Sequence, residues 1–227
     1  LIPENSPYWF SQNPFTQDGT VFTILSGTVI KFLDDVEFTI NGELKINGTE
    51  SDSVYFLAAE NSWDGIHIQP SIPEPLLTSE DGEYIAGNYI SYAVFENARS
   101  PLLGDENDNY YINNISIKNF HGGIKLGAES IYQNIHMINT WELDSLLSNY
   151  YAIYDGLLFN DINIQNSLGD GIVTSEEAEF YDIIIENSNG NGIKGGRVFQ
   201  DVIIAGNIGY GIDCSMDAIL NNISITN

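Results

Sequence analysis

A block of six residues recurs along the C-terminal half of the chain at intervals close to 21 residues. Each copy reads Asn or Asp, aliphatic, any residue, aliphatic, any residue, and in most copies Asn at the end. Clear copies begin at residues 114, 134, 161, 182, 201 and 222, and a weaker copy begins at residue 92. Self-similarity at a fixed period of this length is typical of solenoids, in which each repeat stacks on the one before it.

Within each repeat, the pattern predicts strands rather than helices. The blocks alternate apolar and polar residues with a period of two, which is the period of a β-strand. A Gly-Ile pair follows several blocks, at Gly123, Gly171, Gly192 and Gly211, and a further short apolar segment precedes the next block. Three short strands per turn, stacked turn on turn, form an all-β, single-stranded parallel β-helix of about nine turns, with strands about 4.8 Å apart. A β-sandwich would not require equivalent residues at a fixed spacing.

Two columns of equivalent residues support this fold. An inward column is predicted to stack the rings of Tyr132, Phe159, Phe180 and Phe199 along the interior. A corner column is predicted to stack asparagines, because Asn tolerates left-handed backbone and can hydrogen-bond along the column. The predicted corner column consists of Asn97, Asn119, Asn139, Asn166, Asn187 and Asn227, with Gly206 as the exception.

The repeats also suggest how the chain is divided. Residues 1–26 fit no repeat and carry several aromatic residues and prolines, so we expect an irregular N-terminal cap over the first turn. Residues 27–227 are expected to form the β-helix. Because Asn227 lies one strand into a new turn, we expect the helix to continue beyond it or to stack on another subunit.

Residues 20–68 carry a series of motifs in a recognisable order. Gly27-Thr28-Val29-Ile30-Lys31-Phe32 is followed by Ile40-Asn41-Gly42-Glu43-Leu44, then Ile46-Asn47-Gly48-Thr49, Val54-Tyr55-Phe56 and Trp63-Asp64-Gly65-Ile66. This series resembles the opening of right-handed parallel β-helix repeat proteins that bacteria and archaea secrete or display. The resemblance implies a right-handed helix, an extracellular or cell-surface location and a role as a module of a larger protein. The family includes adhesin-like, stalk-like and polysaccharide-degrading members, so it specifies the fold better than the function.

Charge excludes some partners. Seven Lys and Arg stand against 32 Asp and Glu, for a net charge of −25. Such a surface repels phosphate backbones and anionic lipids, so we expect neither nucleic-acid binding nor membrane binding. The sequence has no apolar run of about 20 residues, which argues against membrane insertion. A single cysteine, Cys214, leaves no internal disulfide framework.

A column of acidic residues is the main candidate for a metal site. Asp161, Asp182 and Asp201 begin successive blocks, so their carboxylates should lie about 5 Å apart. Calcium, which prefers several oxygen ligands, is the cation that such a column would take. The favoured alternative is that each Asp caps its own turn and faces water. The loop with Asp105, Glu106 and Asp108 is a second calcium candidate, but it lacks the usual calcium-loop spacing. No other cofactor is indicated.

A small set of residues could support catalysis. His67, Lys125, Lys194 and Asp213 each follow a Gly-Ile pair, so they should share one outward column. His121, Lys125 and Asp170 are the candidates for an acid, a base or a cationic group that neutralises a uronate. The favoured alternative for Asp170 is that it is a corner residue with a structural role.

Three insertions break the repeat length, at residues 70–88, 99–111 and 140–156. The last contains Trp141, Tyr150 and Tyr151, whose rings could stack on sugar rings beside a flat sheet. The favoured alternative is that these rings pack the loop onto itself.

These features favour a non-catalytic, extracellular structural or adhesive module that contacts carbohydrate or another surface protein. A polysaccharide lyase or glycoside hydrolase is the first alternative. A head-to-tail filament subunit is the second.

Overall fold

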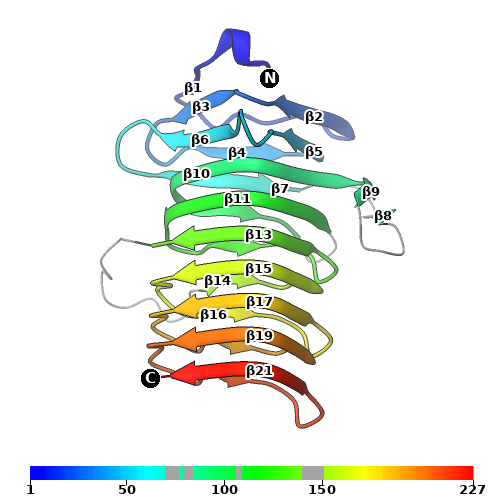
Figure 1. Cartoon of the computed structure of the whole chain (residues 1–227). Helices are drawn as coiled ribbons and strands as arrows, with labels where there is room; N and C mark the ends of the chain where they lie inside the picture. Colours follow the sequence, from blue (N-terminus) through cyan, green and yellow to red (C-terminus); the bar gives the residue numbers. More distant parts are fainter. Residues whose placement is uncertain (70–76, 79–83, 106–108, 140–150, 227) are drawn as a thin grey trace.

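The chain folds into a parallel β-helix of about nine turns, as the repeats predict (Figure 1). The computed structural model describes residues 1–69, 77, 78, 84–105, 109–139 and 151–226. Nineteen strands belong to one hydrogen-bonded network, and the strand pairs within it are parallel. Each turn therefore pairs with the turn before it and the turn after it.

The strands form three faces, which we call the first, second and third sheets. The first sheet begins with β1 (Tyr8–Phe10), β3 (Val29–Phe32) and β6 (Val54–Ala58). The third sheet begins with β2 (Thr20–Leu25) and β5 (Gly42–Asn47). The second sheet contains β4 (Glu37–Ile40), β7 (Trp63–Ile68), β12 (Ile124–Lys125), β14 (Tyr151–Tyr154), β16 (Asp170–Val173), β18 (Ile193–Lys194) and β20 (Ile212–Asp213).

Seven long strands run from the third sheet into the first. They are β10 (Asn88–Leu103), β11 (Tyr110–Phe120), β13 (Ile131–Ile138), β15 (Leu158–Gln165), β17 (Glu179–Glu186), β19 (Val198–Ala205) and β21 (Ile219–Thr226). β10 continues into the second sheet, where it pairs with β7 and β12. Outside the stack, β8 (Leu77–Thr78) and β9 (Tyr84–Ala86) form a small antiparallel hairpin.

The long strands differ from the three separate strands expected in each turn. The last apolar segment of one repeat and the block that opens the next form one continuous strand, bent at a residue with positive φ. These residues include Asn134 (φ 50°), Asp161 (φ 55°), Asp182 (φ 54°), Asp201 (φ 56°) and Asn222 (φ 54°). One left-handed residue turns the chain while the ladder continues on either side, and Asn and Asp tolerate that conformation better than most residues. The first residue of each block is therefore a bend rather than the start of a strand.

The interior contains the predicted stack of rings. Tyr132, Phe159, Phe180 and Phe199 are fully buried, in register on consecutive turns. Their ring centroids are 5.1, 4.8 and 5.0 Å apart along the column, with interplanar angles below 10°. Nearer the N-terminus, Trp63 stacks on Phe32 at 4.1 Å. Apolar side chains thus fill the β-helix as a continuous core.

The asparagine corner follows the prediction over part of its length. Asn119 Nδ2 donates to Asn97 Oδ1 at 2.8 Å, and Asn187 Nδ2 donates to Asn166 Oδ1 at 3.3 Å. All four have positive φ, as does Gly206 at the next turn.

Asn139 departs from this column. Its φ is not positive, its side chain is buried, and its Nδ2 donates to the carbonyl of Phe120 at 2.7 Å. In the sequence, Asn139 directly precedes the insertion at residues 140–156, where the repeat length is broken. Asn227 lies outside the described residues.

The N-terminal segment is more regular than an irregular cap over residues 1–26 would be. β1 pairs in parallel with β3, and β2 pairs in parallel with β5, so both strands already belong to the stack. Only the first residues lie across its end (Figure 1). Leu1 donates to the carbonyl of Thr23 and accepts from the amide of Leu25, and a 3₁₀ helix (Pro3–Asn5) follows. No helix in the described part of the chain is long and apolar enough to cross a membrane.

Candidate ligand-binding sites

Asp170 has a structural role at a corner of the β-helix. Its Oδ1 accepts a hydrogen bond from the backbone amide of Asn191 on the next turn, at 2.6 Å. Asn191 Oδ1 in turn accepts from the amide of Tyr210, at 2.8 Å. The carboxylate therefore satisfies backbone groups between turns, which agrees with the structural alternative for this residue.

His121 lies in a different environment, beside Arg99. The amide of His121 donates to the carbonyl of Arg99 at 3.0 Å, and the guanidinium of Arg99 pairs with Asp64 at 2.7 Å and with Asp35. Burial, together with the positive charge of Arg99, lowers the pKa of the His121 imidazole. His121 is thus associated with an ion-pair network that links neighbouring turns.

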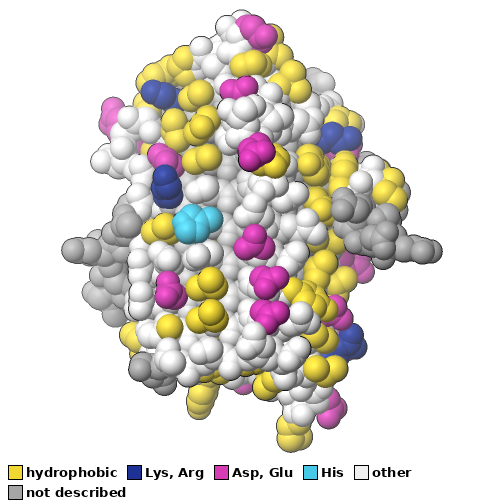
Figure 2. Space-filling model, in the orientation of Figure 1, with side chains coloured by type: hydrophobic (Ala, Val, Ile, Leu, Met, Phe, Trp, Pro, Cys, Tyr) yellow, Lys and Arg dark blue, Asp and Glu magenta, His cyan; other side chains and the backbone are white. Residues whose placement is uncertain are grey.

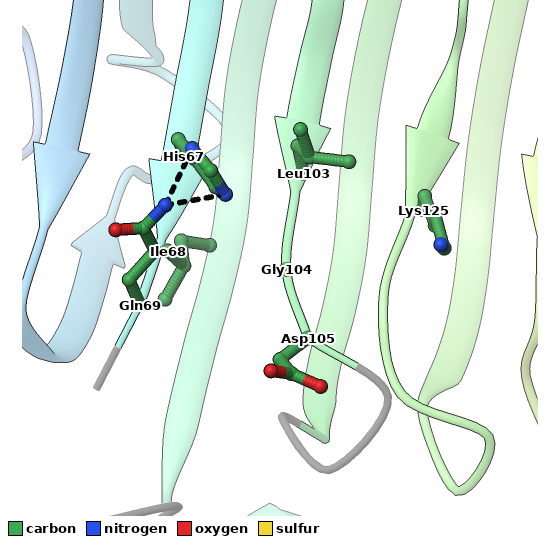
Figure 3. A pocket seen from close by; sticks show the side chains of 7 residues that line it. All are labelled: His67, Ile68, Gln69, Leu103, Gly104, Asp105 and Lys125. Atoms are coloured by element: carbon green, nitrogen blue, oxygen red, sulfur yellow. Dashed lines mark hydrogen bonds between the residues drawn. The ribbon is translucent and has the colours of Figure 1, made fainter. Parts of the chain in front are cut away.

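Lys125, a third predicted catalytic candidate, lines a pocket. The register pairs His67 with Leu103 and Leu103 with Lys125, so these three residues occupy one outward column on consecutive turns. A pocket of about 520 Å³ lies over this column. Figure 3 shows His67, Leu103 and Lys125 in a row, with Gln69 and Asp105 beside them. Lys125 therefore lines the same pocket as His67 and Asp105.

The pocket lining combines several kinds of polar group. Gln69 Nε2 lies 2.9 Å from a ring nitrogen of His67, and His67 Nδ1 lies 3.5 Å from Glu37 Oε1. Lys125 Nζ lies 5.4 Å from the centroid of the Tyr154 ring, within cation–π range. Amide, imidazole, carboxylate and ammonium groups are thus all present in the lining of this pocket.

Local backbone geometry positions Lys125. Gly123 precedes the Gly-Ile strand with φ 61°, and a Cβ at this position would come within 2.1 Å of the Ala152 carbonyl oxygen. Only glycine fits this close approach between turns. Gly123 therefore determines where β12 begins, directly before Ile124 and Lys125. Ile124 then points inward and Lys125 outward, because side chains alternate along a strand.

Sequence reasoning had placed His67 and Lys125 in the outward column, but it did not identify Gln69 and Asp105 as their neighbours. The alternation of side chains along a strand could have revealed both. Gln69 lies two residues after His67, and Asp105 lies two residues after Leu103, so each is expected on the same outward face as its column residue. The sequence pattern presented Asp105 only as part of a calcium candidate, together with Glu106 and Asp108. Glu106 and Asp108, the other members of that calcium candidate, lie outside the described residues.

The acidic column forms a second hollow. Asp161, Asp182 and Asp201 line a groove of about 350 Å³ together with Ile184 and Ile203. Asn222 and Ser224 complete the lining. Asn222 Nδ2 donates to Asp201 Oδ1, and Gln200 Nε2 donates to Asp201 Oδ2 at 3.3 Å.

These carboxylates do not form a metal centre with the residues described. Across those residues, no three His, Cys, Asp or Glu side chains come together in a way that could hold a metal ion. A straight column spaces its carboxylates one turn apart, whereas calcium needs several oxygens converging on one point at about 2.4 Å.

Of the predicted sugar-stacking residues, Trp141 and Tyr150 lie outside the described residues. Tyr151 is half-buried, and its ring centroid is 4.9 Å from that of Tyr154. Burial raises the pKa of the Tyr151 hydroxyl. Its ring packs within the second sheet, which agrees with the packing alternative for this residue.

The fold places the chain among parallel β-helix proteins, in agreement with the resemblance carried by residues 20–68. No family model, no curated protein and no solved structure matches the chain. Because one fold can host unrelated functions, the function has to be argued from the geometry of the two hollows.

Proposed function

We propose that this chain is a non-catalytic, extracellular or cell-surface β-helix module that binds neutral carbohydrate. The observation that carries the proposal is the pocket on the second sheet, lined by His67, Gln69, Asp105 and Lys125. It collects hydrogen-bonding side chains from three consecutive turns of a rigid scaffold.

The chemistry of the lining suits a sugar. A sugar hydroxyl both donates and accepts hydrogen bonds. Lys125 and Gln69 supply donors, Asp105 supplies acceptors, and the His67 ring can do either. Leu103, which is partly exposed, offers apolar surface for the C–H face of a sugar ring.

Charge favours a neutral ligand over an acidic one. Within the described lining, one carboxylate offsets one ammonium. The whole chain carries a net charge of −25, which opposes the approach of a polyuronate.

Rigidity favours recognition. His67 and Lys125 lie on β7 and β12, whose backbones are hydrogen-bonded to the intervening turn of β10. A site built on ladder strands is pre-organised, so binding orders few side chains.

A direct test measures binding of neutral and acidic oligosaccharides by calorimetry. Lys125→Met should lose binding of the neutral ligand. Lys194→Met is the matched control, because Lys194 lies in the same outward column but outside the pocket. The proposal fails if no neutral oligosaccharide in a broad panel binds, or if both variants lose binding equally.

A polysaccharide lyase is the second candidate, favoured by the proximity of His67, Asp105 and Lys125 in one pocket. Lysine and histidine can serve as a base or neutralise developing charge. A hydrolase is less well supported, because it needs two carboxylates and the described lining supplies only Asp105. Release of unsaturated or reducing ends from any polysaccharide, lost in Lys125→Met, would replace the binding proposal with an enzymatic one.

A further inference from the structure

The groove at the bend between the third and first sheets is unrelated to the pocket just described. It crosses β15, β17, β19 and β21. One wall carries Asp161, Asp182 and Asp201, and the other carries Ile184 and Ile203. Figure 2 shows this face, with a column of acidic side chains beside a pair of hydrophobic ones.

The isoleucines differ from the polar residues on the turns that flank them. The register places Ser116, His136 and Asn163 at the equivalent outward position of the preceding turns, and Ser224 at the following one. Between Ser116 and Ser224 on this column, the two isoleucines fall on the turns whose bend residues are Asp182 and Asp201. Apolar side chains return further up the column, at Val94 and Tyr55. Ile203 is 47% exposed, so the core does not require it. The apolar and acidic walls therefore coincide along the same stretch.

Charge complementarity defines the occupant. No Lys or Arg is among the described lining residues, and neither Asp161 nor Asp182 has an ion-pair or side-chain hydrogen-bond partner within the described part. A ligand that suits both walls must present a cationic stripe beside an apolar stripe. An amphipathic basic segment of a protein has this arrangement.

Spacing selects the conformation of that segment. The three carboxylates span two turns of the β-helix, or about 9.6 Å. Cations one turn apart on an α-helix span about 10.8 Å over three positions. Same-face side chains on an extended strand span about 13 Å over three positions. Flexible lysine side chains absorb a difference of about 1 Å more readily than one of about 4 Å.

We propose that this groove is a docking site for a cationic amphipathic α-helix of a partner protein, lying along the axis of the β-helix. Its Lys or Arg side chains would face Asp161, Asp182 and Asp201, and its aliphatic side chains would contact Ile184 and Ile203. The proposal does not depend on carbohydrate binding at the other pocket.

The test uses a synthetic 18-residue helical peptide as the probe. It carries Lys once per turn on one stripe and Leu on the adjacent stripe, and its affinity is measured by fluorescence anisotropy. An isomer of the same composition, with Lys scattered around the helix, controls for simple charge attraction. The designed peptide should bind, its affinity should fall as NaCl is raised, and the isomer should bind more weakly.

Two variants locate the interaction. Asp182→Asn should weaken the designed peptide about fivefold, the upper range for an exposed ion pair. Ile203→Asn introduces the residue found at the equivalent Asn163 and should weaken binding at least about threefold through lost apolar contact. Asp213→Asn removes the same charge on the second sheet, outside the groove, and should leave binding unchanged.

Three outcomes would overturn the proposal. The first is no binding of the designed peptide, and the second is equal binding of the scattered isomer. The third is an equal loss of affinity in Asp213→Asn and Asp182→Asn, which would reveal attraction to the net charge alone. The melting temperature of each variant is recorded, so that a loss of affinity is counted only for a folded protein.

Discussion

At the scale of single residues, the bend positions determine much of the molecule's surface chemistry. Residues with positive φ recur at the same place on successive turns, and Asn or Asp occupies most of them. At Asn134 and Asn222 the side-chain amide donates to the bend residue of the preceding turn, Asn114 and Asp201 respectively. An ionised carboxylate has no proton to donate. The side chains of Asp161 and Asp182 therefore cannot donate hydrogen bonds to the bend residues of the preceding turns.

Asp182→Asn should therefore stabilise the protein. It removes repulsion from Asp161 and Asp201, worth about 1 kcal/mol for the two neighbours together once salt screens these exposed charges. Asn also tolerates the φ of 54° at this position. We expect the free energy of unfolding, measured by denaturant titration, to rise by about 1 kcal/mol.

Asp182→Ala separates the two contributions to this effect. It also removes the charge, but Ala at positive φ costs about 1 kcal/mol, so little net gain should remain. A variant Asp182→Asn that is less stable than the wild type would show that the carboxylate makes a favourable interaction in the native state. For peptide docking, the expected gain in stability means that weaker binding by this variant cannot be blamed on unfolding.

His121 should make stability depend on pH. Its pKa in the folded protein lies below the ordinary value of 6.5 because of burial and the nearby Arg99. The unfolded chain therefore takes up this proton first as the pH falls. The contribution of His121 to the free energy of unfolding is fully present above pH 6.5. It is lost as the pH falls from 6.5 to the lower pKa of the folded state.

Comparison with His121→Gln separates the pH dependence caused by His121 from that caused by the many carboxylates. Between pH 7.5 and about 5, the unfolding free energy of the wild type should decline more steeply than that of the variant. Parallel pH profiles for the two proteins would mean that His121 titrates alike in the folded and unfolded states.

At the scale of strands and turns, the ring column is the feature that best links sequence to stability. Phe180 is fully buried between Phe159 and Phe199, with centroid distances of 4.8 and 5.0 Å. Phe180→Ala should cost about 3–5 kcal/mol, because it removes buried surface and leaves a cavity. Phe180→Leu should cost about 1–2 kcal/mol, since Leu keeps most of the volume but loses both ring contacts.

Denaturant unfolding of the two variants measures both costs. Leu is a suitable comparison because Leu220 occupies the same column one turn beyond Phe199. If Phe180→Leu were as stable as the wild type, ring stacking would contribute nothing beyond the volume it fills.

The same ring column shows how much the sequence could predict. Periodicity alone identified the inward rings, the outward column of His67 and Lys125, and the Asn corner through Asn187, because each depends on a repeat of fixed length. It did not predict that two strand segments merge across the bend at Asp161, since an apolar–polar pattern does not distinguish a bent strand from a corner. Nor did it predict that the side chain of Asn139, next to an insertion, would instead donate to the carbonyl of Phe120.

The sequence predicted only part of the pocket that Lys125 lines, because repeat spacing does not describe the loops between strands. Residue spacing places Lys125 in the outward column, but convergence with Asp105 depends on the path of the chain after β10. The sequence pattern named His121 and Asp170 as catalytic candidates, but it did not show that the His121 amide bonds the Arg99 carbonyl or that Asp170 Oδ1 accepts from the Asn191 amide. Side-chain partners across turns are tertiary contacts, and repeat spacing does not specify them.

At the scale of the whole molecule, the two ends of the stack differ. On the first turn, Leu1 covers β2 through backbone hydrogen bonds. On the last described turn, Leu220 is 55% exposed and Ile225 is 47% exposed, whereas Phe199 and Ile204 at the equivalent positions are buried. Head-to-tail association remains a prediction. Sedimentation velocity would measure it, and Leu220→Asn should reduce any association that uses this surface.

Net charge should govern stability across the molecule. With a charge of −25, the folded chain concentrates repulsion that the expanded unfolded chain relieves. Raising NaCl from about 10 to 150 mM shortens the screening length from about 30 to 8 Å, so the melting temperature should rise. A comparison of calcium chloride with sodium chloride separates general screening from calcium bound at the acidic column.

At matched ionic strength, we expect calcium chloride and sodium chloride to raise the melting temperature equally, because screening depends on ionic strength. The described carboxylates do not converge on a metal position, so no further stabilisation should follow from calcium. A larger rise with calcium that disappears in Asp182→Asn would instead establish a site along Asp161, Asp182 and Asp201. In that event, calcium would compete with a cationic helix for the same groove, and adding it should release the bound peptide.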